Sequence, residues 1–226
     1  MAGSLVFEET GATVVFVATI VGAQAVEWIV TYHERRVTEG ARADSLTGRA
    51  RTAGATLVEV TTTATRGDKE EDRGTKRILV GSLVVSLVLA ALAAQHLTAL
   101  ALPGDGWDWL VVGAGVAWLG IGFRAWAIIT LGRFFRRDVT VAADQYVVTT
   151  GPYRFVRHPA YAGNLLVAAG VGLMLGNAAS VAILVAGTLI GHLPRIRVEE
   201  AALEAELGAP YREFAAGRRR LVPGVW

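Results

Sequence analysis

Cysteine is absent from the 226-residue chain, so disulfide bridges, thiolate metal ligands and a cysteine nucleophile are excluded. Histidine is scarce, and its four copies at positions 33, 96, 158 and 192 lack the spacing of a metal site. We therefore predict that the protein holds no metal. The first apolar segment lacks a basic region and an obvious cleavage site of small residues, so it is interpreted as a retained helix rather than a signal peptide.

The charge balance does not favour nucleic-acid binding. The chain has 22 Lys and Arg against 20 Asp and Glu, and its isoelectric point is about 9.2. The arginines cluster beside apolar stretches rather than on one soluble face, which is the pattern of a membrane protein. We predict no nucleic-acid partner.

Apolar stretches dominate the chain, in which 53% of the residues are hydrophobic and the charges lie in separate blocks. This segregation predicts an all-α integral membrane protein with several membrane crossings. A crossing needs about 20 residues of helix at about 1.5 Å per residue. We predict five transmembrane helices, at residues 12–32, 78–102, 109–131, 160–176 and 178–193.

The distribution of arginine predicts the orientation. The connections 33–77 and 132–158 and the C-terminal tail are basic, whereas the N-terminus and the turns 103–108 and 176–178 hold no Lys or Arg. By the positive-inside rule, the N-terminus lies outside and the C-terminus is cytoplasmic. A composition rich in Ala, Val, Gly and Arg suggests a bacterium, so the plasma membrane is the predicted location.

The chain is expected to divide into two parts. Residues 1–107 form an N-terminal two-span membrane segment whose polar cytoplasmic loop, 33–77, is partly ordered at best. Residues 108–226 form a core of three spans followed by a C-terminal cytoplasmic helix. Pro194 is expected to kink or restart the last helix at the membrane boundary, and Gly208 to cap its end.

Residues 149–164 combine two prolines, two glycines, two tyrosines, two arginines and a histidine. Each proline fixes its own φ and pushes the preceding residue toward extended geometry, so Gly151-Pro152 and His158-Pro159 are predicted turns. Pro159 then begins a helix near its first position. A rigid polar turn at the membrane surface is typical either of a binding site or of an ordinary interfacial loop with aromatic and basic anchors.

Two further patterns each have two interpretations. Arg195 and Glu199 are four residues apart and share a helix face, which is typical of a solvated surface or of part of a site. Glycines in the third predicted span favour close helix packing or close backbone approach to a cofactor. These glycines are Gly113, Gly115, Gly120 and Gly122.

A short hairpin at Gly176-Asn177 makes the fourth and fifth spans antiparallel neighbours. The turn at 149–164 and the charged helix face beginning at Arg195 therefore meet on the cytoplasmic side. The sequence predicts one pocket there, surrounded by Tyr153, His158, Tyr161, Arg195, Glu199 and Glu200.

Three ordered motifs carry a family resemblance. They are Gly151-Pro-Tyr-Arg-x-x-Arg-His-Pro-x-Tyr-x-Gly163, then Arg195-x-x-x-Glu-Glu-x-x-Leu203, then Leu207-Gly-x-x-Tyr211 with a basic tail. Over residues 120–226 the chain resembles the isoprenylcysteine carboxyl methyltransferase family, within the superfamily of phospholipid methyltransferase-like membrane enzymes. Membrane sterol reductases share much of the same C-terminal core.

The resemblance implies an S-adenosylmethionine-dependent methyltransferase whose cofactor lies on the cytoplasmic side, capped by the 132–160 connector and the C-terminal segment. Arg195 would face the substrate, with Glu200 beside it as a second catalytic residue. The implied cofactor contacts are Gln145, Tyr146, Val147, Val148, Tyr153, His158, Pro159, Ala160, Tyr161 and Glu199.

Methyl transfer from a sulfonium requires mainly positioning and exclusion of water. If the acceptor is already a carboxylate, it needs a cation such as Arg195 but no general base. A lipid-like or isoprenoid acceptor would enter sideways from the bilayer, among membrane lipids. The alternatives are an NADPH-dependent sterol-reductase-like enzyme, which usually carries an acidic residue where this chain has Asn164, and a non-catalytic membrane protein of the same fold.

Overall fold

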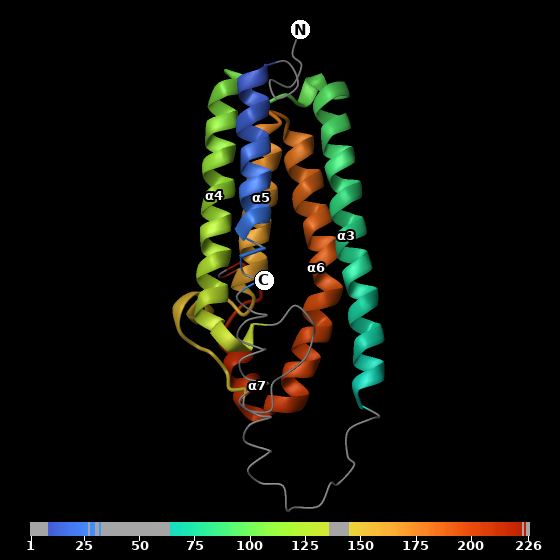
Figure 1. Cartoon of the computed structure of the whole chain (residues 1–226), viewed down its shortest axis with the longest axis vertical. Helices are drawn as coiled ribbons and strands as arrows, with labels where there is room; N and C mark the ends of the chain where they lie inside the picture. The colour runs from blue at the N-terminus through green and yellow to red at the C-terminus, as the bar shows by residue number, and fades with distance from the viewer. Residues whose placement is uncertain are drawn as a thin grey trace, which may run out of the picture.

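The computed structural model describes residues 9–32 except 27, 30 and 31, then 64–135, 145–222 and 224, with side chains in the second range starting at Gly74. The described chain is helical, and its only β-type pairs are two isolated bridges. Long helices run side by side along the long axis (Figure 1). The helices are Thr10–Val26, α3 Ala64–His96, α4 Gly106–Leu131, α5 Pro159–Met174, α6 Ala178–Leu207 and α7 Ala209–Ala216, and the short 3-10 turns are η1 Thr98–Leu100, η2 Gly132–Phe134 and η3 Gly151–Arg154.

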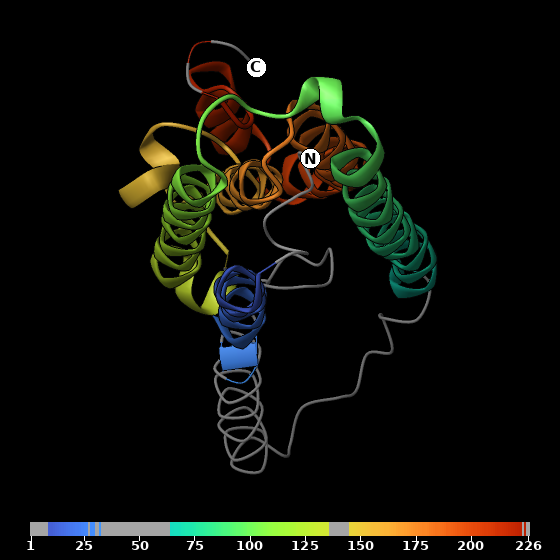
Figure 2. The same ribbon diagram turned by 90° about the horizontal axis from the view of Figure 1, so that it is seen from above.

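Three described stretches are long and apolar enough to cross a membrane: Gly74–His96, Gly106–Phe134 and Ala178–Leu207. Two shorter apolar helices, Thr10–Val26 and Pro159–Met174, lie at the other predicted spans. Seen from above, α5 lies between α4 and α6, α3 lies beside α6, and the N-terminal helix lies on the open side (Figure 2). The predicted helical membrane architecture is confirmed at this level.

Glycine brings α4 and α5 into backbone contact. A Cβ on Gly120 would lie 2.7 Å from the carbonyl oxygen of Gly163, and one on Gly113 would lie 2.5 Å from that of Gly170. Real Cβ atoms essentially never come so close, so these positions need glycine. Gly115 faces open space. The close-packing interpretation of the glycine pattern is therefore confirmed for part of the set.

Small polar residues join α3 to α6. The hydroxyl of Ser180 is fully buried and donates a hydrogen bond to the carbonyl oxygen of Ala90 at 2.7 Å. Further along, Gly187 and Gly191 pack against Ser86 and Ser82 of α3. These contacts hold α3 against α6, which carries part of the predicted site.

The predicted hairpin between α5 and α6 is present, and it corrects one boundary. Gly176 has φ of +65°, and the Asn177 side chain caps α6 by accepting from the backbone N–H groups of Ala179 and Ser180. The Asn177 amide also donates to the carbonyl oxygen of Leu97 at 2.9 Å. The prediction that the second span continues to residue 102 is wrong, because α3 ends at His96. The carbonyl oxygen of the next residue, Leu97, is bound by the Asn177 side chain instead.

Two other sequence predictions need correction. The polar loop predicted over 33–77 lies outside the described residues up to 63, but from Ala64 onward the chain is already helix α3. Lys, Glu and Arg in that stretch are good helix formers, and they extend the apolar helix backward. Pro194 does not restart a helix, since α6 is continuous through it, while Gly208 caps α6 at φ of +59°, as predicted.

Candidate functional site

A cavity of about 380 Å³ lies where α4 ends and α5 begins. Its walls come from α3, α4, the 145–148 segment, η3, α5, α6 and α7. Ten residues predicted for the site line it: Gln145, Tyr146, Val147, Val148, Tyr153, His158, Ala160, Tyr161, Arg195 and Glu199. Pro159 and Glu200 are not among the lining residues that the structure describes.

Two turns position these side chains. Gly151 has φ of +55°, and a Cβ there would lie 2.7 Å from the hydroxyl of Thr130. Pro152 follows in η3 and presents Tyr153 to the cavity, where burial and then the Glu199 charge raise the pKa of the phenol well above its usual range. Pro159 begins α5 directly after His158. Both predicted proline turns are therefore present.

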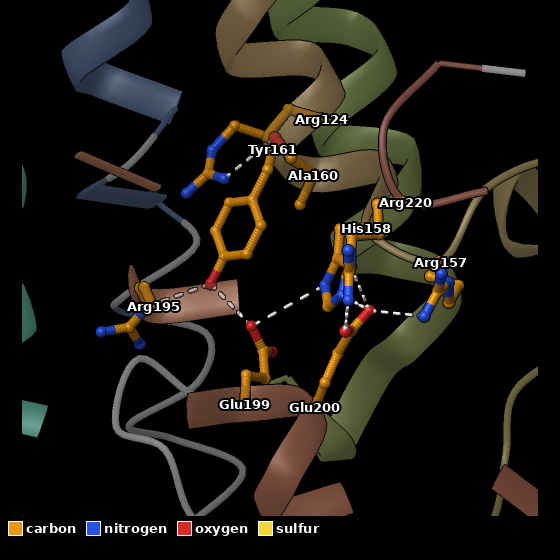
Figure 3. Close-up of polar contacts among 9 residues, drawn as sticks. All are labelled: Arg124, Arg157, His158, Ala160, Tyr161, Arg195, Glu199, Glu200 and Arg220. Carbon is orange, nitrogen blue, oxygen red and sulfur yellow. Dashed lines mark hydrogen bonds and ion pairs between the residues drawn. The ribbon is translucent and has the colours of Figure 1, made fainter. Parts of the chain in front are cut away.

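Tyr161 connects two charged residues of α6 (Figure 3). Its hydroxyl donates a hydrogen bond to Glu199 Oε2 at 2.8 Å and accepts one from Arg195 Nε at 3.0 Å. Arg195 is 7% exposed, which is low for an arginine. Because a buried Arg and a carboxylate share one phenol that itself lines the cavity, this pair is not a simple solvated helix face.

Glu200 points away from this chain of bonds, into a cluster of cations (Figure 3). Arg157 Nη1 donates to its Oε1 at 2.8 Å, and Arg220 donates to its Oε2 from Nε at 3.0 Å and from Nη2 at 2.9 Å. The His158 ring meets the same carboxylate, with Nε2 at 3.2 Å from Oε1. The hydrogen bond to Glu200 raises the pKa of Arg220 above its usual range.

The C-terminal segment is bound to the turn before α5. The backbone N–H groups of Arg157 and His158 donate to the carbonyl oxygens of Arg219 and Arg220 at 2.8 and 2.9 Å. Leu221 is 3% exposed beyond this contact. Segments about 60 residues apart in sequence are thus joined through both backbone and side chains.

A second histidine lies on the other side of Tyr161. The His192 ring packs edge-on against the Tyr161 ring with centroids 4.8 Å apart. Its Nδ1 lies 2.7 Å from the carbonyl oxygen of Thr188, so Nδ1 carries a proton and donates. In the neutral ring Nε2 is then an acceptor, and the Asn164 amide donates to it at 2.9 Å.

The opposite wall of the cavity is apolar and aromatic, and it carries two sets of polar groups, the Tyr211 hydroxyl and the backbone of residues 146–148. Tyr211 is 5% exposed, and its hydroxyl has no hydrogen-bond partner among the described residues. Burial first, and then the Glu200 charge, raise the pKa of this phenol well above its usual range. No backbone hydrogen bond joins Tyr146, Val147 or Val148 to another described residue. The apolar wall includes Leu131, Phe134, Leu203, Leu207 and Phe214.

Sequence reasoning missed four residues of this site. His192 could have been found, because it shares the helix face of Arg195 and Glu199 at spacings of three and seven. Arg124, whose Nη1 donates to the carbonyl oxygen of Ala160 at 3.3 Å, sits one turn after Gly120 and carries no motif. Tyr211 ends the third motif but was given no role, and the role of Arg220 depends on how the chain end folds back.

Among the described residues, no group of three or more His, Asp or Glu side chains is arranged to hold a metal ion. Within the same residues, the partly buried carboxylate Glu200 is instead surrounded by cations.

Comparison with known proteins gives consistent matches. Residues 113–205 match the model of the isoprenylcysteine carboxyl methyltransferase family. Protein-S-isoprenylcysteine O-methyltransferase A of Arabidopsis thaliana is 30% identical over 161 residues, covering 67% of this chain and 82% of that protein. A probable protein-S-isoprenylcysteine O-methyltransferase of Oryza sativa subsp. indica is 34% identical over 154 residues, covering 63% and 79%.

A solved structure has the same fold. The eukaryotic intramembrane Ras methyltransferase ICMT (isoprenylcysteine carboxyl methyltransferase) superposes with a TM-score of 0.53 at 23% identity. The match covers 74% of this chain but 55% of that one. The two proteins therefore share a helical membrane fold over much of this chain.

Proposed function

Because the chain belongs to the isoprenylcysteine carboxyl methyltransferase family, an integral membrane methyltransferase family, we propose that it uses S-adenosylmethionine to methylate a carboxylate on an isoprenoid or lipid-like acceptor. The observation that carries this proposal is the charged end of the cavity. There Glu199, Tyr161 and Arg195 form one hydrogen-bonded chain that offers a carboxylate and a guanidinium to the same space.

The cavity suits the donor in chemistry. About 300–1,000 Å³ is the usual size of a small-molecule pocket, and the volume of about 380 Å³ falls within it. The aromatic and aliphatic wall would bury the adenine, and the backbone groups of residues 146–148 would meet its polar edge. The Tyr211 hydroxyl, which has no partner among the described residues, supports the fit, because a buried phenol without a partner is costly unless a ligand binds it. Glu199 would bind the ammonium or ribose hydroxyls.

The acceptor carboxylate would lie against Arg195. A planar guanidinium holds a carboxylate with two parallel hydrogen bonds, which sets direction as well as charge. The Tyr161 hydroxyl binds the Arg195 side chain and the Glu199 side chain at the same time. The guanidinium and the carboxylate are therefore oriented before a ligand binds. When bound, S-adenosylmethionine supplies an electrophilic methyl group on a sulfonium. The ionised acceptor needs no base, and the enzyme's work is alignment and exclusion of water.

The acceptor would reach the cavity from the bilayer. Leu79 and Val80 of α3 line the cavity, and Val80 is 59% exposed. We propose five spans, with the N-terminus outside and this end of the bundle in the cytoplasm of a bacterium. Support comes from the arginines at this end and from the turn near Asp105 at the opposite end, which has no basic residue.

Two measurements test the proposed function. Calorimetric titration of the detergent-purified protein should give saturable binding of S-adenosylmethionine, and NADPH should not compete. Incubation with methyl-labelled S-adenosylmethionine and N-acetyl-S-farnesylcysteine should then yield a product that releases labelled methanol in base, as a methyl ester does. Binding of NADPH in preference to S-adenosylmethionine would overturn the methyltransferase assignment, and a base-stable labelled product would overturn the carboxylate acceptor.

A further inference from the structure

Glu199 and Glu200 are neighbours in sequence but project about 100° apart around α6. Glu199 lines the cavity and binds Tyr161, whereas Glu200 lies behind the cavity wall among Arg157, His158 and Arg220. The side chain of Glu200 is 13% exposed and that of Glu199 is 32% exposed. Glu200 therefore meets the cavity through Arg157 and His158, which line it, rather than through its own carboxylate.

The contacts of Glu200 determine how the His158 ring is held. The carboxylate accepts from two guanidinium groups, and a carboxylate in this state has no proton to donate. The His158 Nε2 at 3.2 Å must therefore be the donor in that pair, whether the ring is neutral or charged. The other nitrogen, Nδ1, then faces Glu199, with its Oε2 3.9 Å away. Glu200 thus fixes the proton on Nε2 of His158, and Nδ1 is the nitrogen that lies toward Glu199.

The C-terminal segment holds the same ring from its backbone side. The His158 N–H donates to the carbonyl oxygen of Arg220, and the Arg220 side chain binds Glu200 through two nitrogens. His158 stacks on Tyr161 at 5.6 Å between centroids, so any tilt of the imidazole is transmitted to the phenol that joins Glu199 and Arg195. Arg220 is therefore connected, through His158 and Tyr161, to the charged end of the cavity.

We propose that Glu200 and Arg220 are positioning residues for the methyl donor: they bind and orient His158 so that Nδ1 and Glu199 together receive the hydrogen-bonding groups of S-adenosylmethionine. This assignment rests on the proposed function, and it replaces the catalytic role that the family resemblance implied for Glu200. The C-terminal segment accordingly contributes to donor affinity without contacting the donor.

A double-mutant cycle tests the proposal, with S-adenosylmethionine affinity measured by calorimetry for the wild type, Arg220→Gln, His158→Ala and the double variant. Arg220→Gln should weaken binding about tenfold in the wild type and by less than about twofold in the His158→Ala background, since interacting neighbours are not additive. Equal losses in both backgrounds would overturn the proposal. Arg219→Gln is the matched control, because Arg219 is exposed and its side chain makes no hydrogen bond or ion pair among the described residues.

A second variant and a spectroscopic measurement keep the proposal testable if Arg220→Gln fails to fold. If Arg220→Gln does not yield folded protein by thermal melting, the same cycle is run with Arg220→Lys, which keeps the charge but loses the paired donation to Glu200. Nitrogen-15 spectra of the histidine rings provide a readout that a purely structural role would not change: Nε2 of His158 should be protonated in the wild type, and its signal should shift in Arg220→Gln. An unshifted signal counts against the proposal. Absence of donor binding by the wild type would instead refute the proposed function.

Discussion

Arg195 and Glu199 share one helix face and one phenol, yet the proposed function gives them different tasks that mutation can separate. Glu199→Gln removes the charge that would meet the donor, and hydrogen bonds to charged groups contribute about 1.5–3 kcal/mol. Because the Glu199 side chain is 32% exposed, solvent screens part of this, and we expect the lower end of the range. Donor affinity should therefore fall about tenfold.

Arg195→Lys should act on the other side of the reaction. An ammonium cannot reproduce the paired hydrogen bonds of a guanidinium to a carboxylate, and it also loses the Nε donation to Tyr161. We expect turnover to fall about tenfold to a hundredfold, from a loss of about 1.5–3 kcal/mol, while donor affinity changes by less than about twofold.

The assay measures donor binding by calorimetry and methyl-ester formation by base-released label, separately for each variant. Thermal melting of both variants checks that neither has lost the fold. If Arg195 and Glu199 formed only a surface pair, each substitution would cost at most about 1 kcal/mol of stability and would leave both functions nearly unchanged. Equal and mild effects on binding and turnover in both variants would refute the reasoning.

Three further outcomes are expected. Tyr211→Phe removes a buried hydroxyl without a described partner, so thermal stability should be unchanged or slightly higher while donor affinity falls by about threefold to tenfold; unchanged affinity would mean that no ligand binds this hydroxyl. Gly120→Ala should destabilise the protein by about 1–3 kcal/mol, because its Cβ meets the α5 backbone at 2.7 Å, whereas Gly115→Ala, which faces open space, should not; equal melting temperatures would contradict this. Single cysteines at Ser45 and Asp105, introduced into a chain that has none, should be labelled from opposite sides of the membrane, and labelling from one side would refute the proposed topology.

Features that depend on one or two residues were predictable from the sequence. The turns at Gly151-Pro152 and His158-Pro159 form where proline fixes φ, and Gly176 and Gly208 adopt positive φ where a helix or hairpin must end. Because the hairpin at Gly176 forces α5 and α6 together, the meeting of His158 with the acidic turn of α6 also followed from local rules.

Features that depend on distant partners were not predictable. The end of α3 is determined by an amide from Asn177, 80 residues further along the chain, which binds the Leu97 carbonyl. The position of Arg220 depends on backbone pairing between its segment and residues 157 and 158. A run of three arginines gives no indication of which member turns inward, so the sequence could place the C-terminal segment over the cofactor but could not single out Arg220.

The sequence analysis gave the adjacent residues Glu199 and Glu200 of α6 a cofactor role and a catalytic role, and helix geometry bears on this pairing of roles. Two adjacent glutamates on a helix must point in different directions, so only one of them can reach a ligand on a given side. The two side chains differ in exposure and in the groups they bind. Glu199 is the more exposed and binds the Tyr161 phenol at the cavity surface, whereas Glu200 binds the guanidinium groups of Arg157 and Arg220. A partly buried carboxylate paired with two guanidinium groups is costly to disturb, because removing either cation leaves its charge less compensated. That cost is what makes Glu200 suited to holding a histidine in place, and it is also what would make it a poor ligand for a donor that must leave after each turnover.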